Sequence, residues 1–207
     1  MTQTSTPMRL PPAHTAQPPI YLDRVPSPLG TLLLAHGGGH LCALDFSDYE
    51  SRFRKYLARR FGHLPLEQRQ LPEEMQHALQ NYLAGDADAL KHIPVHASGT
   101  RFQQQVWTAL RNIPAGTTCS YTELAASIGQ PSAVRAVGMA NARNPIAIVV
   151  PCHRIIGSHG ELTGYAGGIE RKRWLLIHEG ALQDTGKPVV MPRKRQLLSK
   201  IKSLLTP

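Results

Sequence analysis

The residues of this sequence best suited to chemistry are Cys152 and His153, which are adjacent in the segment IAIVVPCHRIIG. A single cysteine is more often a small buried hydrophobe than a reactive group. An unperturbed thiol, with a pKa of about 8.5, is mostly protonated at neutral pH and needs activation to become a nucleophile. His153 can act as the base, or Arg154 and a nearby helix N-terminus can lower the thiol pKa by their charge. The adjacent pair therefore predicts a nucleophilic cysteine.

Two further segments could complete such a site. Histidine is a stronger base when a carboxylate orients and charges it, and Glu179 in RKRWLLIHEG is the best candidate. The segment GYAGG, from Gly164 to Gly168, is a glycine-rich loop with one aromatic ring. Glycines let backbone approach a ligand closely, and Tyr165 could cover a planar base. An ordinary surface turn has the same composition, so the loop alone leaves both interpretations open.

The remaining cysteines and the histidines give no sign of a metal or a disulfide. Three cysteines are present, an odd number without CxxC spacing: Cys42, Cys119 and Cys152. The histidines nearest to Cys42 also lack ligand spacing, and we interpret them as surface residues: His36, His40 and His63. We therefore predict no metal and no cofactor.

The chain has no run of eighteen apolar residues, and its first twenty residues lack the apolar stretch of a signal peptide. We expect a soluble, unexported protein with reduced thiols in the cytoplasm and with no membrane partner.

The elements that must position Cys152 begin near Thr100. Apolar residues at helical spacing predict a helix that ends before Pro114: Phe102, Val106, Trp107 and Leu110. A short helix then runs from Ser120 or Tyr121 to Ile128, and the break at 129–131 precedes a second helix from Ala133 to about Ala140, with Ser132 as its cap. Two short helices around a glycine-containing turn favour a helix-turn-helix. The apolar run Ile146 to Val150, just before Pro151, predicts a buried strand.

The second of these short helices is unusual because Arg135 is its only charge and most other side chains are small. Recognition helices in the major groove carry several long polar side chains. This helix could instead approach a backbone or a minor groove closely and offer one long side chain. On this segment alone, tight helix packing is the simpler interpretation.

The N-terminal half reads as a separate small domain. Apolar runs at Thr31 to Ala35 and Leu41 to Phe46 flank a glycine turn, which predicts a hairpin. Helical spacing follows at 51–61 and 72–84. We therefore expect a leader over 1–19 that is disordered, an α/β domain over 20–95, a helix-turn-helix domain over 100–180 and a basic tail over 181–207.

The basic excess is confined to the C-terminal half. Residues 1–99 carry nine Lys/Arg and nine Asp/Glu, whereas residues 100–180 carry eight against four and residues 181–207 carry six against one. Such asymmetry suggests a polyanionic partner, with nucleic acid favoured over a membrane. A solvated basic surface would give the same counts.

The order RNP, PCHRIIG, GYAGG and WLLIHEG, from roughly Thr100 to Gly180, closely resembles the methylated-DNA-protein-cysteine methyltransferase family, also called the O6-alkylguanine-DNA alkyltransferases. A weaker resemblance over 20–99 includes the SPLG turn. Membership of this family implies a ribonuclease-H-like N-terminal domain without nuclease activity and a mostly α-helical C-terminal domain. The implied function is repair of O6-alkylguanine, and of O4-alkylthymine, by base flipping and a single irreversible transfer.

The resemblance also implies roles for the residues that match the family's catalytic motifs. Cys152 matches the alkyl-accepting thiol, His153 the base that acts on it through a water, and Glu179 the carboxylate that binds the histidine. Asn144 matches the asparagine that holds the active-site turn, and Tyr121 the tyrosine that rotates a phosphate and protonates the leaving guanine.

Arg135 matches the finger that enters the DNA through the minor groove and fills the space left by the flipped base. The other residues that the resemblance assigns to DNA binding are Ser132, Ala133, Ala136 and Gly138. The implied guanine pocket is formed by Tyr165, Ala166, Gly167, Gly168 and Ile155. The implied partner is double-stranded DNA that contains alkylated guanine, bound by a monomer, with cooperative binding left open. Rival hypotheses are a noncatalytic alkylated-DNA-binding protein, a Cys-His hydrolase that turns over, and a transcriptional regulator.

Overall fold

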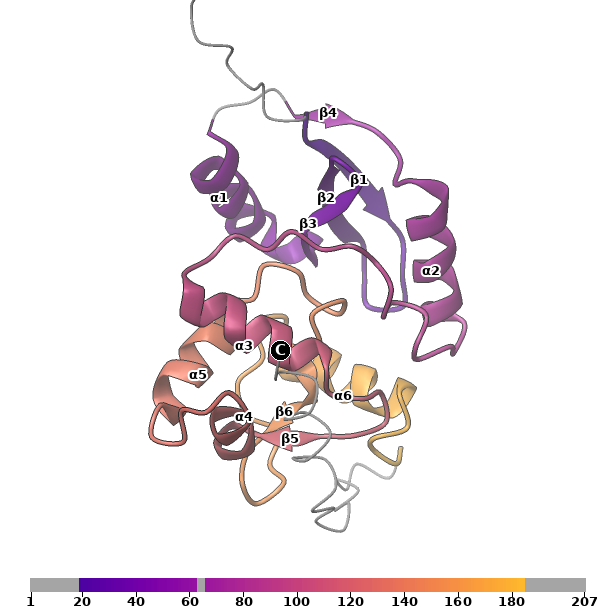
Figure 1. Ribbon diagram of the computed structural model, residues 1–207. Helices are drawn as coiled ribbons and strands as arrows, with labels where there is room; N and C mark the ends of the chain where they lie inside the picture. The colour runs from indigo at the N-terminus through magenta and orange to yellow at the C-terminus, as the bar shows by residue number, and fades with distance from the viewer. Residues whose placement is uncertain (1–18, 63–65, 185–207) are drawn as a thin grey trace, which may run out of the picture.

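The computed structural model describes residues 19–62 and 66–184, and it divides them into an upper half built on a sheet and a lower half built mainly of helices (Figure 1). The predicted leader, except residue 19, and most of the predicted basic tail lie outside the described residues. The expected fold class, an α/β N-terminal domain followed by a mostly helical C-terminal domain, is confirmed.

The N-terminal sheet has the strand order β3-β2-β1-β4. Strands β1 (Tyr21–Val25), β2 (Leu32–Gly37) and β3 (His40–Phe46) are antiparallel neighbours, and the short β4 (Glu67–Gln68) runs parallel to β1. The predicted hairpin is confirmed as β2 and β3, and Gly38 and Gly39 turn between them with φ of 56° and 78°. Glycine suits this turn because it adopts positive φ without a steric penalty.

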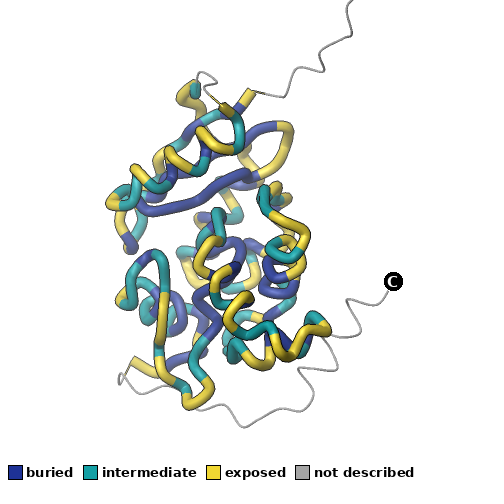
Figure 2. Tube along the Cα trace, turned by 90° about the vertical axis from the view of Figure 1, so that its left-hand side faces the viewer, coloured by how far each residue is buried: buried dark blue, intermediate teal, exposed yellow. Residues whose placement is uncertain are grey.

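Both faces of this sheet are covered, which explains why β2 and β3 are almost continuously apolar (Figure 2). Helix α1 (Glu50–Phe61), which follows a 3-10 turn at Ser47–Tyr49, places Phe53 and Leu57 on one face, against Leu33 and Ala35. The opposite face, with Leu32 and Leu34, packs into a larger core with α2 (Glu73–Leu83) and with the C-terminal half.

The C-terminal half contains α3 (Arg101–Arg111), α4 (Tyr121–Ser127), α5 (Val134–Ala142) and α6 (Ile169–His178). Capping boxes start α3 at Thr100 and α4 at Ser120, because each cap side chain and the residue three positions later satisfy each other's backbone amides. The two predicted short helices therefore exist as α4 and α5. The predicted cap of the second is wrong: α5 starts after Ala133, without a side-chain cap, and Ser132 is exposed.

The predicted strand from Ile146 to Val150 is also wrong. Only Ile146 makes a β-bridge, parallel to Leu44 of β3, and a tight turn follows in which Ile148 has a φ of 68°. Most of this segment is buried between the two halves of the molecule. Its apolar composition therefore reflects burial on all sides, and periodicity alone cannot distinguish such a segment from a buried strand.

The turn at 146–150 attaches the reactive segment to the N-terminal sheet. The backbone amide of Leu44 donates to Pro145 O at 3.0 Å, and Ala147 N donates to Leu44 O at 2.9 Å. One continuous apolar core crosses the junction, so the sheet is part of the support of Cys152.

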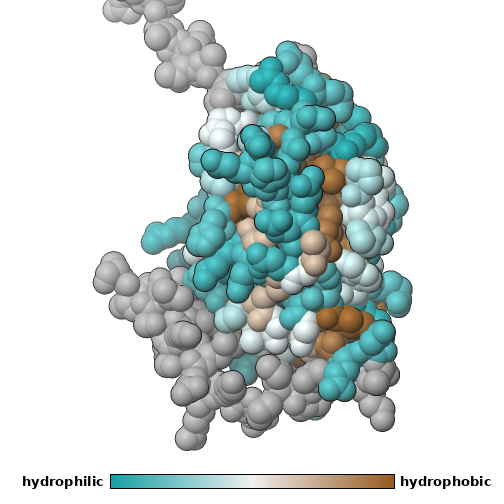
Figure 3. Space-filling model, turned by 90° about the vertical axis from the view of Figure 1, so that its right-hand side faces the viewer, coloured by the Kyte–Doolittle hydropathy of each residue, from teal (hydrophilic) through white to brown (hydrophobic). Residues whose placement is uncertain are grey.

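The side of the molecule shown in Figure 3 is mostly hydrophilic with small apolar areas. No helix in the described ranges is long and apolar enough to cross a bilayer.

Candidate active site

Cys152 starts a 3-10 turn, Cys152–Arg154, immediately after the tight turn that ends at Pro151. The residue is only 5% exposed, and this burial raises the pKa of the thiol. A hydrogen bond from Asn144 and the positive charge of Lys172 act in the opposite direction and favour the thiolate. The nucleophile is thus shielded from water, and its activation depends on its immediate neighbours.

Asn144 fixes both the turn and the thiol. Its Nδ2 donates to Val150 O at 2.7 Å and to Cys152 Sγ at 3.0 Å, while its Oδ1 accepts from Ile146 N at 3.0 Å. One amide side chain therefore holds the strained segment at three points and points a donor at the sulfur. This placement agrees with the role that the sequence resemblance implies for Asn144.

His153 is fully buried and faces Glu179, with Nε2 3.0 Å from Oε1. Burial lowers the pKa of His153, although Glu179 opposes this effect. Because a carboxylate accepts hydrogen bonds, it selects the tautomer with the proton on Nε2 and leaves Nδ1 as the basic nitrogen. Nδ1 is buried and has no protein partner among the described residues.

Glu179 is held by more donors than the sequence predicts. Arg154 binds both carboxylate oxygens, with Nε to Oε2 at 2.8 Å and Nη2 to Oε1 at 2.9 Å. Tyr82 of α2 donates its hydroxyl to Oε1 at 2.8 Å. Burial favours a raised pKa for Glu179, but His153 and Arg154 outweigh it and hold this pKa well below its usual range. The carboxylate therefore stays ionised.

Arg154 consequently has a different role from the one left open by sequence analysis. Its guanidinium is directed to Glu179 and to Ile113 O, and within the described residues it makes no hydrogen bond to the thiol. The cation that does influence Cys152 is Lys172 on α6. Its Nζ donates to the carbonyl oxygens of Ile155 and Thr163, and burial lowers its pKa to about 8.

Tyr121 opens α4 and reaches between α5 and the loop before α6. A Cβ added at Gly138 would lie 3.8 Å from its ring, and one added at Gly164 would lie 3.7 Å from its hydroxyl. Burial raises the pKa of Tyr121, hydrogen bonding to Thr163 lowers it, and the charge of Cys152 raises it. The structure therefore brings this phenol into the same neighbourhood as the thiol.

The glycine-rich loop covers the site from the α6 side. The Tyr165 ring meets the His153 ring edge to face, with centroids 6.5 Å apart, and its hydroxyl is buried without a partner in the described ranges. Gly167 tolerates no side chain, because a Cβ there would lie 2.4 Å from Phe46 and 2.6 Å from Tyr165. Gly168 has a φ of 92° and precedes α6.

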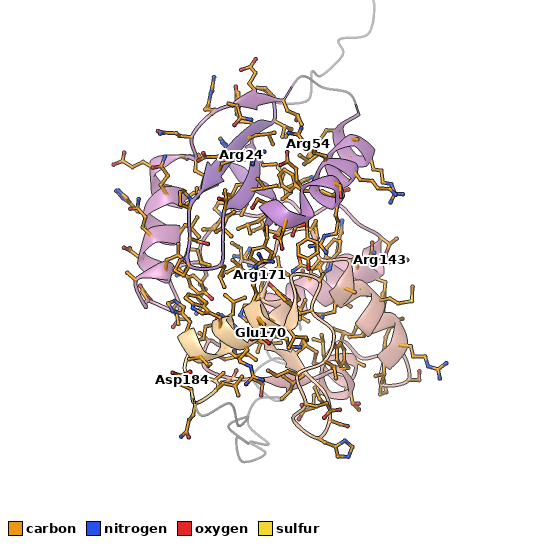
Figure 4. All side chains as sticks on the ribbon, turned by 180° about the vertical axis from the view of Figure 1, so that it is seen from behind. Arg24, Arg54, Arg143, Glu170, Arg171 and Asp184 are labelled. Carbon is orange, nitrogen blue, oxygen red and sulfur yellow. The ribbon has the colours of Figure 1, made fainter. Side chains whose placement is uncertain are left out.

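Two arginines that sequence analysis missed fasten this loop to the N-terminal domain. Arg52 of α1 donates to Ala166 O at 2.7 Å and forms an ion pair with Asp45. Arg171 of α6 donates to Gly167 O and Leu29 O, pairs with Asp48, and lies over the Phe46 ring. Figure 4 shows Arg171 where the two halves meet. The loop position thus depends on both domains.

The residues assigned to DNA lie on or beside α5. Arg135, Ala136 and Ser132 are exposed, whereas Ala133 and Gly138 are half-buried. Ile155, which was assigned to the guanine pocket, is fully buried in β6 (Ile155–Ile156), which pairs in parallel with β5 (Cys119–Ser120). Its assignment to the guanine pocket stays a prediction.

The interpretation of the histidines needs one correction. His36 is buried rather than exposed, with Nε2 3.2 Å from Arg69 O. His40 is exposed, and His63 lies outside the described residues. In the described ranges, no three His, Cys, Asp or Glu side chains are grouped closely enough to hold a metal ion. The absence of a metal remains a prediction.

The chain matches two domain families that together span most of it. Residues 20–97 match the ribonuclease-like domain of 6-O-methylguanine DNA methyltransferase, and residues 101–181 match the DNA binding domain of the same protein. The methylated-DNA–protein-cysteine methyltransferase of Salmonella typhimurium is 43% identical over 163 residues, which cover 77% of this chain and 95% of the relative. The protein of the same name from Mycobacterium leprae is 46% identical over 157 residues, 76% of this chain and 90% of the relative.

Solved structures agree with these sequence relatives. Mycobacterium tuberculosis OGT in complex with DNA matches with a TM-score of 0.65 and 42% identity, over 77% of this chain and 92% of that chain. The O6-methylguanine methyltransferase of the same organism matches with a TM-score of 0.64 and 40% identity, over 78% of this chain and 93% of that chain. Sequence and fold lead to the same conclusion: the chain belongs to the methylated-DNA–protein-cysteine methyltransferase family.

Proposed function

We propose that this protein repairs O6-alkylguanine, and O4-alkylthymine, in double-stranded DNA by moving the alkyl group irreversibly onto Cys152 Sγ. The observation that carries the proposal is the buried thiol, which receives a hydrogen bond from Asn144 and is followed directly by the His153–Glu179 pair. A nucleophile with an adjacent base that is itself oriented by a carboxylate is the arrangement that group transfer to sulfur requires.

In the proposed reaction, the thiol proton passes through a water to Nδ1 of His153, and Glu179 balances the imidazolium that forms. The thiolate attacks the alkyl carbon, so that an S–C bond forms while the C–O6 bond breaks. The guanine leaves as a neutral base after it takes a proton, for which Tyr121 is the donor. Asn144 and Lys172 stabilise the thiolate before it reacts.

The product explains why each molecule would react once. Hydrolysis of the S-alkylcysteine would have to expel a thiolate from a saturated carbon, and a base such as His153 does not make that thiolate a better leaving group. This property separates the proposal from a Cys-His hydrolase, whose acyl intermediate must be hydrolysed to regenerate the thiol. A noncatalytic alkylated-DNA-binding protein would not need an acceptor thiol with a base beside it.

Access to the thiol requires that the damaged base leave the duplex, because an O6-alkyl carbon inside the stack is out of reach. We assign the DNA contact to α4 and α5, with Arg135 as the side chain that fills the vacated space. Binding as a monomer and residence in the cytoplasm, where the thiols stay reduced, are further parts of the proposal. Cooperative binding along DNA is left open.

Arg135→Ala tests the flipping step separately from the chemistry. Extrusion of a base costs a few kcal/mol. If Arg135 offsets about 2.7 kcal/mol of this cost, its loss should slow repair of an alkylated duplex by roughly 100-fold. The free base O6-benzylguanine already lies outside any stack, so the variant should react with it at nearly the normal rate. Rates of benzyl and methyl transfer to the protein would measure both effects.

Tyr165→Ala is the matched control, because it damages the pocket itself and should slow both reactions. An equal loss with both substrates in Arg135→Ala would place Arg135 in the chemistry or in the fold. Unchanged duplex repair would show that the exposed side of α5 does not take part in flipping.

A further inference from the structure

Met139 on α5 is the one large apolar side chain that is exposed in the described part of the chain, with 54% of its surface accessible. The rest of the outward side of α5 carries small or charged residues. A single exposed apolar residue is ordinary on a protein surface. Its position relative to the helix and its neighbours distinguishes this one.

Met139 lies at the centre of the exposed arc of α5. At about 100° per residue, the exposed positions around it occupy an arc of roughly 120°, and they are Arg135, Ala136, Ala142 and the C-cap residue Arg143. The buried positions, Val137, Ala140 and Asn141, lie on the other side. Trp107 of α3 bonds there to Ala140 O. The exposed arc is therefore a separate surface, free of the packing that holds α5 in the domain.

The neighbours of Met139 along this arc are cations. Arg135 precedes it by four positions and Arg143 follows it by four, so the three long side chains form one stripe. Neither arginine has a side-chain hydrogen bond or an ion pair within the described ranges. Figure 4 shows Arg143 at the outer edge of the helical half. The stripe thus combines an apolar centre with two positive ends, flanked by alanines.

We infer that Met139 packs against the deoxyribose edges of the DNA minor groove and that Arg143 contacts a backbone phosphate beside it. This inference rests on the proposed function, which places α5 and Arg135 against DNA. The walls of the minor groove are sugar C–H surfaces bordered by phosphates. With Arg135 in the space left by the base, an apolar side chain followed by a cation matches the sugar and the phosphate that lie beside that space. Apolar side chains are a common means by which minor-groove proteins contact and deform the duplex.

A protein partner fits this surface less well than DNA does. Specific protein interfaces bury about 800 Å² per partner and have an apolar centre formed by many residues, whereas this arc has one. Its small side chains, Ala136 and Ala142, leave the two arginines and Met139 as the groups that project. Such a ridge suits a narrow groove with negative walls.

The salt dependence of binding to an undamaged duplex separates the two kinds of contact. A phosphate contact releases about one counterion, so Arg143→Gln should reduce the slope of log affinity against log salt by about one. An apolar contact releases none. Met139→Ala should therefore weaken binding by roughly fivefold at every salt concentration, through lost apolar burial, without changing the slope.

Met139→Leu is the matched control, because it keeps the apolar volume, and it should bind within about twofold of the unchanged protein. Thermal unfolding of each variant would exclude loss of fold, since Met139 is exposed and does not belong to the hydrophobic cores of the described residues. Met139→Ala with unchanged affinity, Met139→Leu as weak as the alanine variant, or an altered slope in either would overturn the Met139 contact. An unchanged slope in Arg143→Gln would overturn the phosphate contact. If Arg135→Ala also left duplex binding and repair unaffected, the proposed DNA surface itself would be wrong.

Discussion

Replacement of Cys152 by serine should abolish alkyl transfer while the protein still binds alkylated duplex DNA. A serine hydroxyl is far less acidic than a thiol, so the same histidine cannot produce a comparable nucleophile. Loss of a nucleophile in a Ser or Cys enzyme costs at least roughly 10⁴-fold in rate. The exposed face of α5 does not include Cys152, so binding in a mobility-shift assay should persist.

The other cysteines provide matched controls for this variant. Cys42 and Cys119 are also buried and free, and burial raises the pKa of both thiols, that of Cys119 to about 12. Neither has a basic histidine next to it in the sequence. Cys42→Ser and Cys119→Ser should therefore retain transfer. If folded Cys152→Ser lost binding together with transfer, Cys152 would be a structural residue instead.

Replacement of Glu179 by glutamine should have the second largest effect. The neutral amide no longer balances an imidazolium on His153, and it no longer selects the tautomer that leaves Nδ1 free, so transfer should slow by about 10³-fold or more, as for other oriented histidines. Arg154 would also remain buried without its counter-charge, which costs about 3–5 kcal/mol of folding stability. Single-turnover rates and chemical denaturation would measure the two effects.

The pH dependence gives this prediction a sign. Glu179 raises the pKa of His153 in the intact site, so its loss should lower that pKa further and move the acid limb of the rate profile to lower pH. The folded-state pKa of Glu179 is itself lowered. Its contribution to stability is therefore complete above the unfolded value of about 4.3 and is lost as pH falls toward the folded value.

Tyr82→Phe is the control that separates charge from hydrogen bonding at the same oxygen. It removes one neutral donor to Glu179 but leaves the charges of His153 and Arg154 in place. This substitution should lower the free energy of unfolding by about 1 kcal/mol and leave the pH profile of the transfer rate nearly unchanged. A loss as large as that of Glu179→Gln would mean that the carboxylate charge is not the decisive property.

Local sequence patterns were sufficient to predict the features that local physics determines. Helical spacing located α1, α2 and α3, and two continuous apolar runs on either side of a glycine turn located the β2–β3 hairpin. Cys152 and His153 are adjacent in the chain, so their chemistry could be proposed from the sequence directly. Glu179 was found because it follows a recognisable segment, and the structure places it 3.0 Å from His153.

Other features could not be predicted because they depend on contacts between distant segments. Tyr82 reaches Glu179 across 97 positions and Arg52 reaches Ala166 across 114, and neither is distinguished by its neighbours in the chain. Lys172 stands among other basic residues and looks like a solvated charge until its burial is known. The turn at 146–150 was mistaken for a strand because burial between domains produces the same apolar composition.

Intact mass spectrometry after incubation with an excess of O6-methylguanine duplex tests the central claim most directly. The proposed mechanism predicts that each protein molecule gains the mass of one methyl group, that peptide mapping locates it on Cys152, and that repair stops at one lesion per protein. Repeated repair by one molecule without a mass gain, or a methyl group found on Cys42 or Cys119, would contradict irreversible transfer to Cys152.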